Sequence, residues 1–242
     1  MTDEVLTQLA STGTLRAGIN MANKLLVTGE TASGDPDGVG PEFAAKIAER
    51  LGVGIKYVPF PTPGDLADAA EDGVWDIGLI GAEPCRAEKI AFTAAYVEIE
   101  ATYMVPAGSP IQSIEEVDQP GIRISVSGRS AYDLFLTRNL KHAELVRAKG
   151  LPGATKLFVE EKLDALAGLR PPMAEDLPNL PGARILDGRF TAVRQAVGTP
   201  KANEAAAAFL SDFVEESKKN GLAGELIDKH GVTGKLSVAQ AG

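Results

Sequence analysis

The chain has 242 residues, a formal net charge of −9, and a hydrophobic fraction of 44%. This length suffices for one large domain or two modest ones, and the acidic balance argues against nucleic acid or an anionic membrane surface as a partner. The single cysteine excludes an internal disulfide, and the two histidines are far apart in the sequence, so we expect neither a metal site nor a cofactor.

The N-terminal segment lacks the basic stretch and following apolar stretch of a signal peptide, and no run approaches the ~20 apolar residues of a membrane span. We expect no membrane insertion and a monomer. Two localisations stay open: the cytoplasm, or the periplasm if a signal peptide has been removed.

In the first part of the chain, short apolar runs alternate with amphipathic segments, which is typical of β–α units around a mostly parallel sheet. One helix is expected from Pro41, at its first position, to Gly52, at its end, with a buried stripe of Phe43, Ile47 and Leu51. A turn is expected at 33–40, a short helix at 65–73, and strands at 14–19, 54–60 and 74–81.

The pattern then begins again. Ser130 opens an expected helix over 130–141, and a second helix is expected near 154–162. Residues 171–182 are expected to form a loop. Strands are expected at 122–127, 144–148, 163–169, 183–188 and 190–198, followed by helices at 201–221 and 222–230.

These segments predict two α/β lobes, the second inserted into the first, with crossovers near Tyr103–Ala107 and Gly188–Arg194. Lobe 1 would comprise residues 1–105 and 192–242, and lobe 2 residues 106–191. Two lobes joined by two crossings suggest a hinged clamp with a binding site in its cleft.

The stretch "RAEKIAFTAAY", from Arg86 to Tyr96, resembles the solute-binding proteins of polar amino acid ABC transporters, bacterial family 3. The helix "GVGPEFAAKIAERLG" and the turn "SGRSAYD" are also similar to that family, and the resemblance extends from about Leu15 to about Gly231. It implies a two-lobed type II periplasmic-binding fold that closes on a small ligand, and a permease as partner.

By this resemblance, Arg86 corresponds to the arginine that holds the ligand carboxylate, and Arg129 and Ser130 correspond to a second-lobe turn that meets the same group. A guanidinium matches a carboxylate with two parallel charge-assisted hydrogen bonds, and the helix opened by Ser130 adds free N–H groups. The residues expected to contact ligand are Gly81, Ala82, Arg86, Asn23, Lys24, Arg129, Ser130 and Arg170.

The sequence also departs from the family. No serine or threonine precedes Arg86, and Leu169 and Arg170 occupy the region where an acidic residue often holds the ligand ammonium. The first loop lacks the usual stacking aromatic. A small carboxylate, with or without a second anionic group, therefore fits better than an ordinary α-amino acid, and Glu83 is left to pair with Arg86 or with the ligand.

Each candidate has a structural alternative. Arg86 could be a surface arginine that caps the next helix or pairs with Glu83 or Glu88. Ser130 could be an ordinary helix cap, and Arg170 could be a solvated loop cation. Arg194, near the second crossover, is equally ambiguous. Cys85 is expected to be a small buried thiol and Trp75 a core residue.

The leading hypothesis is a non-enzymatic substrate-binding component of an ABC transporter. The first alternative is an enzyme on the same scaffold that resembles cyclohexadienyl dehydratases, with Glu83 or Glu98 as the acid. Glu175 and Asp176 lie in the expected loop and are weaker candidates. The second alternative is a cytoplasmic ligand sensor.

Overall fold

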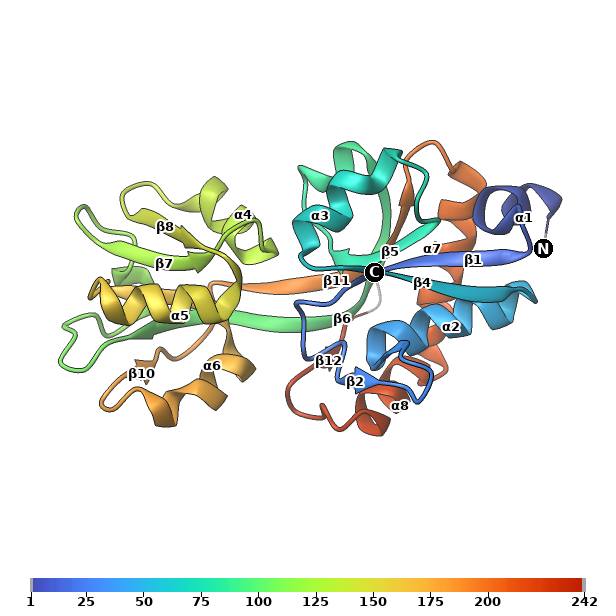
Figure 1. The fold of residues 1–242 in the computed structure, drawn as a ribbon. Coiled ribbons are helices and arrows are strands. Elements are labelled where there is room, and N and C mark those ends of the chain that lie inside the picture. Colours follow the sequence, from blue (N-terminus) through green and yellow to red (C-terminus); the bar gives the residue numbers. More distant parts are fainter. Residues whose placement is uncertain (1, 241–242) are drawn as a thin grey trace. The chain divides into compact units, whose positions relative to one another are not determined.

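The structure is a computed structural model that describes residues 2–240 (Figure 1). By its internal contacts the chain divides into two compact units, unit 1 (Met1–Glu98 and Arg194–Gly242) and unit 2 (Ile99–Val193). The chain passes between them along β6 (Ile90–Val105) and β11 (Thr191–Pro200). The boundaries expected from the sequence were 105/106, at the end of β6, and 191/192, within β11.

In unit 1, β1 pairs in parallel with β4 and with β5, and β11 adds to β5 in antiparallel. The strands are β1 (Thr14–Asn20), β4 (Gly54–Phe60), β5 (Ile77–Gly81), parts of β6 and β11, and β12 (Ser237–Val238), with a small hairpin of β2 (Gly29–Glu30) and β3 (Pro36–Asp37). β5 is buried along its whole length, as expected for a central strand of a covered sheet.

Helices cover both faces of this sheet, with α3 on the face opposite to α2 in Figure 1. They are α1 (Asp3–Ala10), α2 (Val39–Leu51), α3 (Pro63–Asp68), α7 (Glu204–Lys219) and α8 (Leu222–Lys229), with 3₁₀ turns η1 (Ala69–Glu71) and η2 (Arg86–Glu88). The expected stripe of Phe43, Ile47 and Leu51 is buried on α2, and Phe43 stacks on Tyr96 with ring centroids 4.5 Å apart.

In unit 2, β7 pairs in parallel with β8 and with β9, and β6 runs antiparallel to β9 and to β10. The elements of this unit are β7 (Arg123–Ser127), β8 (Glu144–Ala148), β9 (Ala165–Leu169), β10 (Arg184–Ile185), α4 (Ala131–Asn139), α5 (Gly150–Glu160), α6 (Arg170–Asp176), η3 (Ile114–Glu116) and η4 (Leu177–Asn179).

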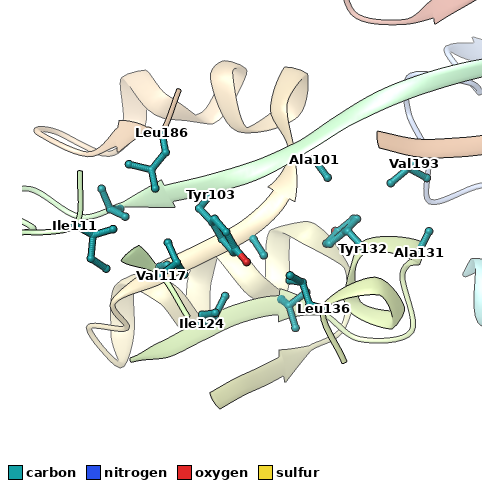
Figure 2. Close-up of a cluster of buried hydrophobic side chains, with 14 residues drawn as sticks. Ala101, Tyr103, Ile111, Val117, Ile124, Ala131, Tyr132, Leu136, Leu186 and Val193 are labelled. Atoms are coloured by element: carbon teal, nitrogen blue, oxygen red, sulfur yellow. The ribbon is translucent and has the colours of Figure 1, made fainter. Parts of the chain in front are cut away.

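The core of unit 2 gathers apolar side chains from β6, β7, β9 and α4. Figure 2 shows the ring of Tyr103 in the middle of this cluster, near Val117, Ile124 and Leu136. Burial raises the pKa of the Tyr103 hydroxyl, so this phenol stays neutral. Each unit therefore has a hydrophobic core of its own.

Most expected elements are present, and the differences have local causes. The prediction of a loop at 171–182 is wrong, because α6 and η4 occupy most of this segment. The prolines that suggested a loop lie in the first turns of these helices, where proline is tolerated because the N–H groups lack helical partners anyway. α2 begins at Val39, two positions before Pro41. The sequence analysis predicted neither α1 nor β6. β6 was missed because Glu98 and Glu100 interrupt its apolar pattern.

Candidate functional site

Arg86 follows the carboxyl end of β5 and opens η2. The residue is only 6% exposed, and its guanidinium donates a hydrogen bond of 2.7 Å to the carbonyl oxygen of Gly81. A buried guanidinium is stable only with hydrogen-bond acceptors around it. The alternative of a surface arginine is therefore wrong.

Gly81 and Ala82 lie beside Arg86 but offer different groups. The carbonyl of Gly81 is one partner of Arg86, and the N–H of Ala82 donates to the carbonyl oxygen of Arg194 at 2.8 Å. Because β11 already uses the N–H of Ala82, that group cannot bind a ligand. These contacts fix the strand end from which Arg86 projects.

Gln195 is a polar residue at this strand end that sequence reasoning missed. It lies opposite Gly81 in the antiparallel pairing of β11 with β5, and it is 3% exposed. Its side-chain oxygen has no hydrogen-bond partner within residues 2–240. An unsatisfied buried acceptor costs about 1–3 kcal/mol, so its presence at this place requires an explanation. The only sequence signal was a glutamine inside the apolar run "AVRQAVG".

The loop after β1 carries Asn23 and Lys24. Asn23 is buried, and its side-chain oxygen accepts a hydrogen bond of 3.2 Å from the N–H of Leu25. Lys24 is exposed. Asn23 therefore shapes its own loop, as asparagines in turns commonly do, while Lys24 projects from the loop surface.

In unit 2, Arg129 and Ser130 form the turn between β7 and α4. Arg129 has a left-handed backbone, with φ of 62°, and its N–H donates to the carboxylate of Asp133 at 2.7 Å. The hydroxyl of Ser130 accepts from the N–H of Asp133 at 3.1 Å. Ser130 is thus the helix N-cap, as expected, and Asp133 holds the turn from within the helix.

Asp133 is a second residue that sequence reasoning left without a role. It is 2% exposed, and the guanidinium of Arg147 donates to its two carboxylate oxygens at 2.9 and 3.2 Å. Burial raises the pKa of the adjacent Tyr132 to about 12, although hydrogen bonds with Ser130 and Ser127 oppose the shift. The turn is therefore fixed by the buried carboxylate of Asp133, which pairs with the partly exposed Arg147, and it is flanked by a neutral phenol.

Arg170 opens α6 rather than lying in a loop. Its guanidinium donates to Glu100 and to the carbonyl oxygen of Leu186, each at 3.1 Å, and to the carbonyl oxygen of Gly188. These partners join α6 to β6 and to the segment before β11. Arg170 therefore has a structural function, and the solvated loop cation considered as its alternative is wrong.

The candidate residues share one position in the topology: each follows the carboxyl end of a parallel strand. Arg86 follows β5 and Asn23 follows β1, and these strands are neighbours in unit 1. Ser130 follows β7 and Arg170 follows β9, which are neighbours in unit 2. In open α/β sheets, ligands bind at these carboxyl ends.

Two further expectations concern reactive groups. Cys85 is exposed in the turn before η2, so the expected buried thiol is wrong, whereas Trp75 is buried at 1% exposure as expected. Glu98 accepts a hydrogen bond of 3.1 Å from Arg194. Within the described part of the chain, no three acidic, histidine or cysteine residues gather as metal ligands.

Comparison with known families gives a match along most of the chain. The sequence profile of the bacterial extracellular solute-binding proteins, family 3, matches residues 15–233. No helix within residues 2–240 is long and apolar enough to cross a membrane.

Solved structures with the same fold are mostly those of binding proteins. An ancestral amino acid-binding protein, described as a precursor of cyclohexadienyl dehydratase, has a TM-score of 0.73 at 22% identity, covering 93% of this chain and 98% of its own. An amino acid ABC transporter substrate-binding protein from Streptococcus pneumoniae, bound to L-arginine, has a TM-score of 0.73 at 18% identity, covering 92% and 96%. These similarities confirm the expected α/β, type II periplasmic-binding fold.

One curated relative is an enzyme. Cyclohexadienyl dehydratase of Pseudomonas aeruginosa is 28% identical over 120 residues, which cover 48% of this chain and 44% of the dehydratase. The match thus spans less than half of that enzyme. The family profile covers far more of the sequence, and the chain belongs to the bacterial extracellular solute-binding proteins of family 3.

Proposed function

We propose that this solute-binding protein captures a small carboxylate-bearing solute, with Arg86 as the carboxylate receptor, and delivers it to an ABC permease. The observation that supports this most directly is a guanidinium only 6% exposed at the carboxyl end of β5, beside Gly81. A planar guanidinium binds a carboxylate through two parallel N–H···O bonds, and such charge-assisted bonds contribute roughly 1.5–3 kcal/mol each.

The solute is an amino acid or a related organic acid. The similar proteins support this class, since the Streptococcus pneumoniae protein is bound to L-arginine and one from Wolinella succinogenes is complexed with lysine. A second anionic group on the solute was expected partly because Arg170 could bind it. The guanidinium of Arg170 already binds Glu100 and two carbonyl oxygens, so this reason no longer holds. An ordinary α-amino acid thus returns as a candidate.

Thermal unfolding with a panel of amino acids and organic acids tests this proposal. A ligand at about 100 times its Kd should stabilise the protein by about 2.7 kcal/mol. Arg86→Met should lose this stabilisation, because the side chain keeps its length but has no donors. Arg50→Met is the matched control, since Arg50 pairs with Glu216 on an exposed surface. If no small acid stabilises the protein, or if Arg86→Met binds as tightly as the wild type, the proposal is wrong.

A dehydratase is the second candidate, and the partial match to cyclohexadienyl dehydratase favours it. Among the acids considered for this role, Glu98 is already bound by Arg194, and Glu175 and Asp176 lie in α6. Glu83 lies in the turn between β5 and η2. Incubation of the protein with prephenate or arogenate tests the idea. Absence of turnover, with ligand stabilisation intact, would leave binding as the function; we favour that outcome.

The family description, extracellular solute-binding proteins, supports a periplasmic location for this chain. A cytoplasmic sensor is the competing role. Cell fractionation of a host that expresses the full-length gene product separates the two, because a periplasmic protein is released by osmotic shock and a cytoplasmic one is retained.

A further inference from the structure

We propose that the C-terminal strap, defined as residues 233–240, confines the bending of β6 to Ile99 and Glu100 and thereby strengthens the binding of the solute. The observation that carries this inference is a change of partner along one edge of β6, from β12 to β9, at the boundary between the two units. The inference rests on the proposed function and on the closure that the resemblance to family 3 predicts.

The two edges of β6 face different strands. The carbonyl oxygen of Ala101 accepts a hydrogen bond of 3.1 Å from the N–H of Phe190, which leads into β11. The carbonyl oxygen of Tyr96 accepts one of 3.2 Å from the N–H of Ala239, which follows β12. Because the polar backbone groups of successive residues in a strand point to opposite edges, the odd-numbered residues of this stretch face β11 and the even-numbered ones face the strap.

On the edge that faces the strap, two strands follow one another with a gap between them. β12 pairs with β6 at Val97 and Glu98, in unit 1, and β9 pairs with it over residues 101–104, in unit 2. Ile99 and Glu100 lie beyond the ends of both strands. Within residues 2–240, β6 therefore has only β11 beside it at these two residues, and a two-stranded ribbon twists more than a wider sheet.

A buried lysine of α7 holds the end of the strap. The ammonium of Lys218 donates to the carbonyl oxygen of Gln240 at 3.1 Å and pairs with the carboxylate of Glu215 at 2.6 Å, and its side chain is only 3% exposed. Leu236 and Ala239 of the strap are themselves buried. Since lysine side chains are almost never buried without such partners, we infer that Lys218 fastens the strap to unit 1.

A fastened strap favours binding through conformational entropy. With the strap in place, β6 is paired on both edges up to Glu98, so bending is confined to two residues and few backbone angles are ordered when the protein closes. With the strap detached, the unpaired part of this edge begins at Tyr96. Closure then has to order a longer mobile stretch, and binding that orders more of the chain is weaker.

Amide hydrogen exchange, followed by NMR without any solute, tests where β6 bends. In the wild type the N–H of Glu100 should exchange faster than those of Glu98 and Thr102, which face the same edge opposite β12 and β9. Lys218→Met removes the donor but keeps the length, and truncation after Val238 removes both anchored residues of the strap. In both variants the exchange of Glu98 should approach that of Glu100, while Thr102 stays protected.

Two exchange results overturn the inference, and neither requires a ligand. The first is equal protection of Glu98, Glu100 and Thr102 in the wild type, which decides the matter even if the variants do not fold. The second is unchanged protection of Glu98 in both variants, which would mean that the strap does not restrain β6.

Isothermal titration calorimetry tests the effect on binding, with the small acid that stabilises the wild type most. Both strap variants should bind this acid at least about fivefold more weakly than the wild type. Lys219→Met is the matched control and should bind as the wild type does, because Lys219 is the exposed neighbour of Lys218 on the same helix.

If the exchange of Glu98 accelerates but the affinity stays within about twofold of the wild type, the strap does not strengthen binding and the inference is wrong. A wild type that binds no small acid refutes the proposed function, and with it the effect on binding. Binding that requires Arg86 but is the same with and without the anchored strap refutes only this inference.

Discussion

At the scale of single residues, carboxylates that accept backbone N–H groups hold the turns of unit 2. Asp133 does so at the turn before α4, and Asp118 does so before β8, where it accepts from the N–H groups of Lys141, His142 and Ala143 at 2.8–2.9 Å. Desolvation opposes ionisation of Asp118, but these three hydrogen bonds, together with the nearby His142, outweigh it and lower the pKa of its carboxyl from its ordinary value.

This lowered pKa predicts how stability varies with pH. Because the pKa of Asp118 is lower in the folded state, its contribution is complete above the unfolded pKa and is lost as the pH falls through the folded one. Asp118→Asn should lower the free energy of unfolding by about 1 kcal/mol at pH 7 and by less at pH 3. Urea unfolding at both pH values measures this difference, with Asp212→Asn, on the exposed side of α7, as control. A loss of the same size at both pH values would contradict the assignment.

At the scale of elements, one glycine joins the loop after β1 to the start of α2. Gly38 has φ of 143°, a conformation that favours glycine, and it precedes α2. A Cβ atom there would lie 2.3 Å from the carbonyl oxygen of Leu26. The close approach is maintained by the N–H of Gly40, which donates to the same oxygen at 3.0 Å. The loop that carries Asn23 and Lys24 is thus held against the helix.

Gly38→Ala should therefore destabilise the protein by roughly 2–5 kcal/mol, the sum of backbone strain and overlap with the loop. Gly34→Ala is a close control: its φ of 84° is also positive, but a Cβ atom there meets nothing within 4 Å, so only strain of about 1–2 kcal/mol is expected. Chemical denaturation of both variants gives the comparison. Equal losses would mean that the loop moves away from α2 without cost.

At the scale of the whole molecule, the two units are connected through the continuous strands β6 and β11. The resemblance to family 3 predicts closure on a ligand, and this stays a prediction. Small-angle scattering tests it with the solute of the panel that stabilises the protein most: saturation should lower the radius of gyration of the wild type but not of Arg86→Met. An unchanged radius, with binding proven by calorimetry, would mean that capture does not require closure.

The sequence determined most of the local elements, and the place of the site that it suggests stays a prediction. Periodic apolar residues and Gly52 predicted α2, and buried apolar runs predicted β5 and β7. Parallel strands align their carboxyl ends, so the order of strands and helices indicated which segments follow those ends. The choice of Arg86 and Ser130 within these segments came from the resemblance to family 3, and their contact with a ligand stays a prediction. These features depend on residues within one turn or one strand, which a linear pattern records.

Only the tertiary structure decided which polar groups are already occupied. Arg170 binds Glu100, and Gln195 lies opposite Gly81; in each pair the partners are far apart in the sequence and meet through strand pairing or helix packing. The same holds for Cys85, whose exposure depends on the turn that follows β5. Burial and hydrogen bonding are properties of the packed chain, because they depend on which distant segments displace water, and one sequence read along its length does not contain that information.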